Sequence, residues 1–221
     1  MVFIIGVAGG SGSGKSTVTE QIINSVEKNS VSVFLQDNYY LDRSHLTMAE
    51  REQINFDHPN ALDWDLMKSQ LKNLYEGNQI EQPVYEFSTH TRSSKIQKIS
   101  PAKIIIVEGI FALYDEWITK HMALRIFVDT APDIQLMRRL KRDIVERERT
   151  LDSVLEMYSQ RVRPMYKKFV EPTKRRAHII IPHGSNKAAL EMIVSRIKSV
   201  INNQNITISS GWNFEEDDGV I

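Results

Sequence analysis

The sequence contains no cysteine among its 221 residues. Disulfide bonds, thiolate catalysis and metal sites with cysteine ligands are therefore excluded, and the composition is compatible with a reducing compartment. Net charge is also absent, because 28 basic side chains balance 28 acidic ones. A chain without net charge lacks the overall field that draws proteins to nucleic acid or to anionic membranes, so we expect neither as a partner.

Long hydrophobic runs are missing as well. No apolar stretch approaches the ~20 residues that a membrane-spanning helix needs. The apolar start of the chain is short, carries no positively charged leader and is typical of a strand, not of a signal peptide. We therefore expect a cytoplasmic, soluble protein. Its length suits one α/β domain over residues 1–201, followed by a polar and then acidic tail over residues 202–221.

A glycine-rich motif follows the first apolar run. It fits the pattern G-x-x-x-x-G-K-[ST], whose glycines let successive N–H groups converge on phosphate oxygens while the following helix adds its positive dipole end. The motif predicts a bound nucleoside triphosphate, with Lys15 at the β/γ-phosphates and Ser16 on Mg2+. A flexible Gly/Ser loop is the alternative. The predicted triphosphate-binding residues are Gly9, Gly10, Ser11, Gly12, Ser13, Gly14, Lys15 and Ser16.

Apolar runs recur along the chain and alternate with stretches of helical spacing. The runs cover residues 2–7, 31–35, 104–107, 124–128 and 179–181. This alternation predicts an α/β fold of the P-loop NTPase type, a parallel sheet covered by helices on both faces. Helices are predicted after a capping box at 47–50, over 63–77, over 132–147 and around 190–197.

Two regions are expected to cover the substrate. Segments 82–87 and 92–99 have the pattern of a β-hairpin with residues 88–91 at its tip. This insert, at about 80–99, separates the second and third core strands and suits a lid on the acceptor side. A further lid region is expected at about 138–165.

Three carboxylates directly follow core strands, where open parallel sheets bind their ligands. They are Asp37, Glu108 and Asp129. Phosphoryl transfer needs one carboxylate near the attacking hydroxyl and another that helps to hold Mg2+. Each of the three could instead be a turn or helix-capping residue, and Asp129, before Thr-Ala-Pro, most resembles a cap.

The third predicted helix carries several arginines. Arg138 and Arg142 share a face at spacing i,i+4, and Arg139 and Arg142 do so at i,i+3. Guanidiniums placed there could clamp the transferring phosphate. The alternative is a solvated face on which Asp143 and Glu146 balance the arginines.

Seven segments occur together in the order and spacing of one family. They are residues 9–16, 36–40, 55–61, 83–87, 90–92, 108–110 and 142–147. In them the chain resembles the uridine kinases, the uridine–cytidine kinase family, from residue 2 to about residue 200. The phosphate loop is common to many enzymes, whereas the segment 56–63 combined with His-Thr-Arg at 90–92 is specific to this family.

The resemblance implies that the γ-phosphate of ATP or GTP passes to the 5′-hydroxyl of uridine or cytidine, in pyrimidine salvage. It implies Asp37 as the base near that hydroxyl, Ser16 and Glu108 as the residues that serve Mg2+, and Asn186 beside the donor base. It also implies a homo-oligomer, a tetramer. The implied catalytic residues are Lys15, Asp37, Arg147 and Arg149.

On the acceptor side the resemblance places Asp57 at the ribose hydroxyls and Tyr85 with His90 at the pyrimidine. Arg139 and Arg149 belong at the acceptor and the transferring phosphate. Taken alone, Asp57 could be part of an X-Pro turn and Tyr85 a packed hairpin aromatic. The implied acceptor-binding residues are Asp57, Tyr85, Phe87, His90, Arg139, Arg149 and Met157.

Three positions depart from the pattern of the family. Glu148 replaces the usual glycine between two lid arginines, Met157 replaces a glutamine that contacts substrate, and His183 replaces an arginine in the donor-base loop. Loss of the glycine removes easy access to positive φ. Loss of the glutamine removes a hydrogen-bond partner for the acceptor. We expect altered affinity or regulation more than lost activity.

Two other functions remain open. A related kinase could phosphorylate another small alcohol, such as pantothenate or ribulose phosphate, although the hairpin with Tyr85 and His90 favours an acceptor that carries a base. A nucleotide switch without transfer is the second alternative. Against a guanine-reading switch, Asn186-Lys187-Ala188-Ala189 lacks the aspartate of an Asn-Lys-x-Asp motif.

Overall fold

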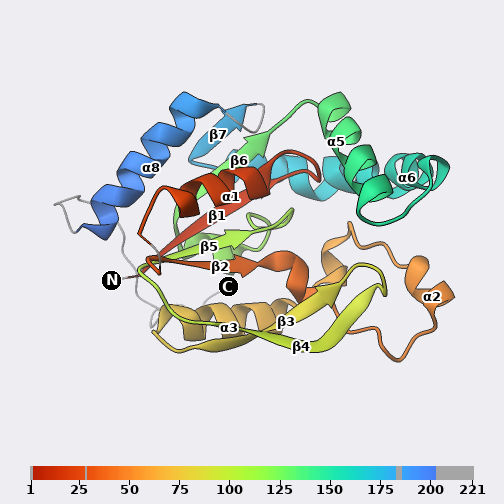
Figure 1. Ribbon diagram of the computed structural model, residues 1–221, viewed down its shortest axis with the longest axis horizontal. Coiled ribbons are helices and arrows are strands. Elements are labelled where there is room, and N and C mark those ends of the chain that lie inside the picture. The colour runs from red at the N-terminus through yellow and green to blue at the C-terminus, as the bar shows by residue number, and fades with distance from the viewer. Residues whose placement is uncertain (1, 28, 183–185, 203–221) are drawn as a thin grey trace, which may run out of the picture.

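The computed structural model describes residues 2–27, 29–182 and 186–202. A five-stranded sheet at its centre has the strand order β2-β5-β1-β6-β7, with every neighbouring pair parallel (Figure 1). Each of the five predicted apolar runs overlaps one strand, so the predicted parallel sheet is confirmed. The strands are β1 (Phe3–Gly9), β2 (Val31–Leu35), β5 (Ile104–Glu108), β6 (Met122–Asp129) and β7 (Ile179–Pro182).

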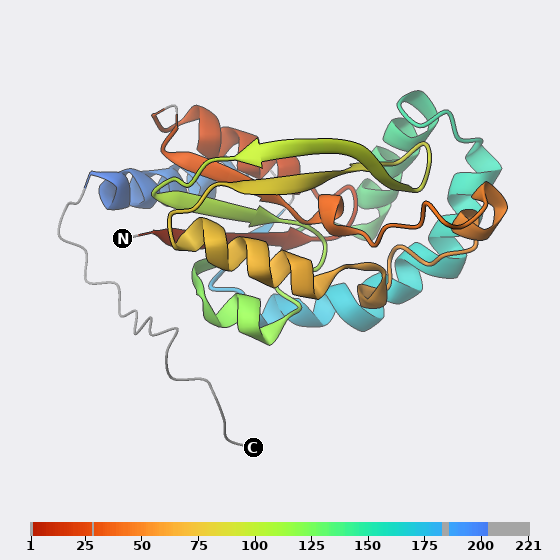
Figure 2. The same cartoon turned by 90° about the horizontal axis from the view of Figure 1, so that it is seen from below.

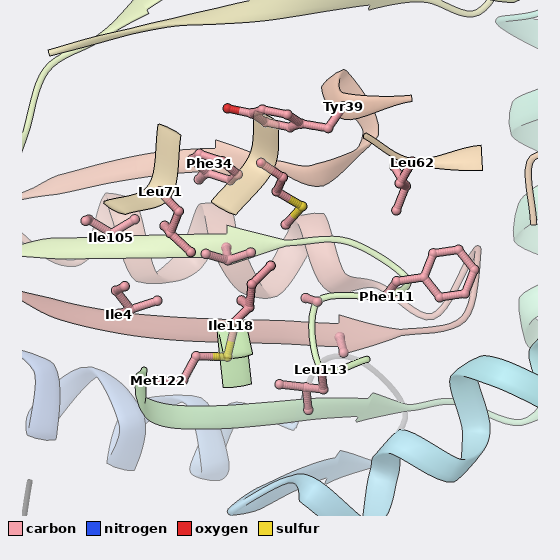
Figure 3. Close-up of a cluster of buried hydrophobic side chains, with 14 of the residues drawn as sticks. Ile4, Phe34, Tyr39, Leu62, Leu71, Ile105, Phe111, Leu113, Ile118 and Met122 are labelled. Atoms are coloured by element: carbon pink, nitrogen blue, oxygen red, sulfur yellow. The ribbon is translucent and has the colours of Figure 1, made fainter. Parts of the chain in front are cut away.

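Both faces of this sheet are buried. Along β5, Ile104 and Ile106 point into one apolar cluster, and Ile105 and Val107 point into the other, because side chains alternate across a strand. Helices α1 and α8 close the first cluster, and α3 closes the second, part of which Figure 3 shows. The bounds of these helices are Lys15–Asn24 (α1), Trp64–Tyr75 (α3) and Lys187–Ile201 (α8).

The predicted hairpin forms a separate two-stranded antiparallel sheet of β3 (Ile80–Glu86) and β4 (Thr91–Ile99). Its tip is residues 87–90, one position earlier than predicted, because Thr91 already pairs with Glu86 in the ladder. The Thr91 hydroxyl also accepts a hydrogen bond from the backbone N–H of Arg43 at 2.7 Å. These contacts attach the hairpin to the segment that follows β2.

Further helices complete the described part of the fold. They are α2 (Met48–Glu52), α4 (Glu116–Lys120), α5 (Pro132–Val145) and α6 (Leu151–Met157), after which helical turns continue through residue 176. The predicted capping box is confirmed, since Thr47 and Glu50 bond reciprocally at the start of α2, and the Asp63 side chain caps α3. The hairpin tip, α2 and α6 lie at the same end of the molecule in both views (Figures 1 and 2).

No helix among the described residues is long and apolar enough to cross a membrane.

Candidate active site

The glycine-rich loop joins β1 to α1, and local contacts fix its shape. The Lys15 ammonium donates a hydrogen bond to the Gly10 carbonyl at 3.0 Å. Gly12 has a φ of 80°, and a Cβ atom there would overlap the backbone carbonyl of Gln135. Because α1 begins at Lys15, the positive end of its dipole faces the loop. The loop therefore has the curvature and the polarity of a phosphate cradle.

Four polar side chains meet where β2 and β5 end and α1 begins. The Ser16 hydroxyl donates a hydrogen bond to a Glu108 carboxylate oxygen at 2.7 Å. Burial lowers the pKa of Lys15, while Glu108 and Asp37 oppose the shift. Burial raises the pKa of Asp37, and the Lys15 charge opposes that shift. These four residues line one cavity of about 410 Å³.

The pair of Ser16 and Glu108 fits a Mg2+ ion that shares its coordination with phosphate. A hydroxyl and a carboxylate are hard oxygen ligands of the type that Mg2+ takes from proteins. Within the described residues no group of three or more His, Asp and Glu side chains could hold a metal by itself. Phosphate oxygens and water would therefore complete the coordination, as is usual for Mg2+ at nucleotide sites.

A second cavity of about 1040 Å³ adjoins the first. Both cavities are lined by Asp37, which lies at the start of the single helical turn η1 (Gln36–Tyr39) directly after β2. The structure brings together in this larger cavity all the residues expected on the acceptor side. They are Asp57, Tyr85, Phe87, His90, Arg139, Arg149 and Met157. Arg147, expected as a catalytic residue, lines the same cavity.

Aromatic rings form one wall of the larger cavity. Tyr85 and Tyr40 lie with ring centroids 5.0 Å apart, and Phe56 stacks on the His90 ring at 5.5 Å. Burial lowers the pKa of His90, so its imidazole is neutral at pH 7. Such a wall gives a flat ring a surface for stacking. Tyr40 and Phe56 were not singled out by sequence reasoning, although both lie within the motifs that carry the resemblance.

Arginines of α5 connect the acceptor cavity to the phosphate loop. Arg139 and Arg142 both donate to the Ser11 hydroxyl, at 3.1 and 3.3 Å. Arg139 is only 6% exposed, and Asp143 is fully buried between the arginines. The alternative of a solvated face is therefore wrong for Arg139, Arg142 and Asp143, whereas Arg138 and Glu146 are exposed.

Comparison with known proteins shows the family of this chain. The profile of the Phosphoribulokinase / Uridine kinase family matches residues 4–189. The chain belongs to this family. It is 50% identical over 200 residues to a uridine kinase of Deinococcus deserti, covering 90% of this chain and 97% of that one. A uridine kinase of Staphylococcus carnosus is 50% identical over 202 residues, covering 91% and 97%.

Solved structures support the fold of the family. A putative fructose transport system kinase from Silicibacter sp. TM1040 superposes with a TM-score of 0.66 at 16% identity, over 82% of this chain and 90% of that one. A possible uridine kinase from Bacillus stearothermophilus superposes with a TM-score of 0.52 at 23% identity, over 81% and 88%. At these identities the likeness concerns the parallel sheet and its helices, and confirms the predicted fold class.

Two of the departures from the family pattern lie at the arginines. Glu148 has a φ of 53°, in the left-handed region that favours glycine. The expectation that loss of the glycine removes access to positive φ is therefore wrong: Glu148 adopts it, at a strain of roughly 1–2 kcal/mol. The Met157 sulfur accepts hydrogen bonds from Arg149 at 3.1 Å and from Arg139 at 3.5 Å.

Three further residues lie away from the two cavities or outside the described part of the chain. The expectation that Asp129 caps α5 is wrong: Asp129 pairs with Lys174, and the residue before α5 is Ala131, which has no capping side chain. Asn186 caps α8, where its side chain accepts from the Ala189 N–H at 3.1 Å, and it lines neither cavity. Its place beside the donor base stays a prediction. His183 and the tail from residue 203 lie outside the described residues.

Proposed function

We propose that this protein transfers the γ-phosphate of ATP or GTP to the 5′-hydroxyl of uridine or cytidine, giving the monophosphate. The observation that carries the proposal is the position of Asp37, whose side chain borders both the phosphate-loop cavity and the cavity with the aromatic wall. A hydroxyl placed at this junction meets a carboxylate on one side and the donor phosphates on the other. The similarity of this chain to uridine kinases of Deinococcus deserti and Staphylococcus carnosus supports uridine as an acceptor.

The donor binds at the phosphate loop. Backbone N–H groups of residues 9–16 and the Lys15 ammonium hold its phosphates. We propose Asn186 beside its base, as the family resemblance implies. Mg2+, when bound at Ser16 and Glu108, supplies positive charge to the phosphate oxygens. Arg147 and Arg149 stabilise the negative charge that spreads over the transferring group.

The acceptor binds in the larger cavity. Asp57 accepts hydrogen bonds from the ribose hydroxyls, and Tyr85, Phe87 and His90 contact the pyrimidine. Asp37 then lies at the 5′-hydroxyl and takes its proton as the new oxygen–phosphorus bond forms, while the bond from the γ-phosphorus to the β,γ-bridging oxygen breaks and the nucleoside diphosphate leaves. Arg139 stands where the acceptor oxygen and the transferring phosphate meet.

The proposal includes a cytoplasmic enzyme of pyrimidine salvage that works as a homo-oligomer, a tetramer, without nucleic acid or membrane partners. Support for this comes from the family and from the absence of cysteine and of net charge in the sequence.

A coupled assay of donor consumption tests the function. Uridine, cytidine, pantothenate and ribulose 5-phosphate are offered as acceptors, each with ATP and with GTP. We expect turnover with the two pyrimidine nucleosides alone. Turnover with pantothenate or ribulose 5-phosphate alone would instead favour the related kinases, and nucleotide hydrolysis that no acceptor changes would favour a switch.

A further inference from the structure

Asp143 is a fully buried carboxylate surrounded by arginines from the end of α5 and the loop beyond it. One oxygen, Oδ1, accepts from Nε and Nη2 of Arg142 at 2.9 and 2.8 Å and lies 3.5 Å from Arg147. The other, Oδ2, lies 3.3 Å from Arg139 Nε and 3.9 Å from Arg149. One negative charge therefore meets four guanidiniums.

The four arginines all carry positive charge and repel one another, and the negative charge of Asp143 offsets part of this repulsion. Burial and then the nearby Arg142 charge lower the pKa of Arg147 to about 10, although Asp143 opposes the shift. The charges of Arg139, Arg142 and Arg147 overcome the effect of burial and lower the pKa of Asp143, so its carboxylate stays ionised at neutral pH. The cluster keeps an excess of positive charge.

The excess positive charge lies beside the phosphate loop and the acceptor cavity. Arg139 and Arg142 reach from Asp143 to the Ser11 hydroxyl in the phosphate loop, and Arg147 and Arg149 line the acceptor cavity. Asp143 lines neither cavity, so it does not itself touch either substrate. Its effect on the reaction therefore passes through the guanidiniums that it holds.

We propose that Asp143 is a positioning residue, which gathers the four arginines into one phosphate-receiving cluster before the substrates bind. Donors fixed in advance stabilise developing charge without reorganising during the reaction. Arginines held by one buried carboxylate are fixed in this way, and they still carry surplus positive charge for the phosphates. The inference rests on the proposed function for its kinetic test, but not for the spectroscopic test below.

The kinetic test compares two variants of Asp143 with a matched control. Asp143→Asn keeps the shape but turns an NH2 group toward Arg139 and Arg149, which are themselves donors, so we expect kcat with uridine to fall about tenfold to a hundredfold. Asp143→Glu keeps the negative charge but moves the carboxylate by the length of one methylene group. We expect its kcat to lie between those of the wild type and Asp143→Asn. The control, Asp133→Asn, removes an exposed carboxylate from the same helix and should leave kcat within about twofold of the wild type.

The affinity for MgATP, measured by calorimetry, separates positioning from misfolding. A folded variant keeps the phosphate loop, so its dissociation constant should stay within about threefold of the wild type while kcat falls. A kcat of Asp143→Asn equal to that of the wild type would overturn the proposal. Where Asp143→Asn fails to fold, Asp143→Glu decides: a reduced kcat with normal affinity for MgATP supports positioning, and a wild-type kcat refutes it.

A spectroscopic readout needs no acceptor. The Nε–H of Arg142 donates to the Asp143 carboxylate, so its exchange with water, followed by ¹⁵N NMR, should be slow in the wild type and several-fold faster in Asp143→Asn, since bonds to a charged acceptor are about twice as strong as neutral ones. Unchanged exchange would refute the positioning role. A wild-type protein that makes no UMP would refute the proposed function, and the Arg142 signal would still decide the role of Asp143.

Discussion

The side chain of Asn38 accepts a hydrogen bond from the backbone N–H of Tyr85 at 3.0 Å. The other end of the same amide donates to the Gln82 side chain, also at 3.0 Å. One residue next to Asp37 thus holds the hairpin strand that carries Tyr85. The hairpin is therefore attached to the segment of the proposed base, and we expect the two to keep a fixed separation.

Replacing Asn38 by alanine should raise the Michaelis constant for uridine. Loss of two hydrogen bonds, each worth about 0.5–1.5 kcal/mol, frees the strand that positions the aromatic wall, and we expect an increase of about tenfold with a smaller change in kcat. Steady-state kinetics with uridine measure both. The control is Asn73→Ala, at an exposed position on α3. An unchanged Michaelis constant in Asn38→Ala would show that the hairpin holds its place without this contact.

Asp37→Asn should retain triphosphate binding and slow phosphoryl transfer. The amide fills the same space but cannot take the proton of the 5′-hydroxyl, and loss of a general base typically costs ~10²–10⁴-fold. Turnover at saturating uridine, together with calorimetry of MgATP binding, measures the two effects separately. A drop in turnover of less than about threefold would contradict the role of Asp37 as base.

The pKa of Asp37 should respond to its two charged neighbours in opposite directions. Burial raises this pKa, Lys15 lowers it and Glu108 raises it further. Glu108→Gln should therefore lower the pKa, and Lys15→Met should raise it. Titration of the ¹³C-labelled carboxyl group by NMR measures the shift in each variant. A shift of the same sign in both variants would contradict this account of the site.

The raised pKa of Asp37 also has a consequence for stability. The folded chain holds this proton to a higher pH than the unfolded chain, so the contribution of Asp37 to stability falls as pH rises between the two pKa values. We expect Asp37→Asn to unfold at a higher denaturant concentration than the wild type at pH 7. The difference should disappear below the pKa of the unfolded chain. Equal midpoints at pH 7 would show that the carboxylate is not penalised in the folded state.

The parallel sheet could be predicted because its signals are local. The apolar run at 104–107 has no polar interruption, as a strand buried on both faces requires, and the phosphate loop follows directly on such a run. Asp37 and Glu108 could be found for the same reason, since each is the first acidic residue at the carboxyl end of its strand.

The rest of the site depends on contacts between distant residues. Asp143 has the spacing of a helix-surface carboxylate, but Arg147 and Arg149 from the following loop join Arg139 and Arg142 of its own helix around it. Asp129 has the sequence context of a cap, but Lys174, far along the chain, pairs with it. Tertiary contacts of this kind override local preference, and one sequence carries no signal for them.

The side chain of Met157 is the hydrogen-bond acceptor for two arginines. Its sulfur is a weak hydrogen-bond acceptor, yet it lies 3.1 Å from Arg149 Nη1 and 3.5 Å from Arg139 Nη2. A glutamine at this position would offer a stronger acceptor to the same two donors. Its remaining NH2 group could then reach the acceptor in the cavity that Met157 lines.

Met157→Gln should therefore tighten nucleoside binding. The gain is about that of one hydrogen bond, roughly 0.5–1.5 kcal/mol or up to about tenfold in the Michaelis constant, and kcat should change little if the bond is equally strong in the ground and transition states. The matched control is Met137→Gln, because Met137 is 55% exposed on α5. Acceptor kinetics with uridine and with cytidine measure the effect.

The opposite result would have an equally definite cause. If the side chains around residue 157 pack as an apolar wall, the amide NH2 of Met157→Gln is buried without a partner, which weakens binding by a similar amount. The Michaelis constants for uridine and cytidine would then both rise, while Met137→Gln stays at the wild-type value. That outcome would mean that the pocket has been rebuilt around the sulfur, and that the contact usual in the family cannot be restored by one substitution.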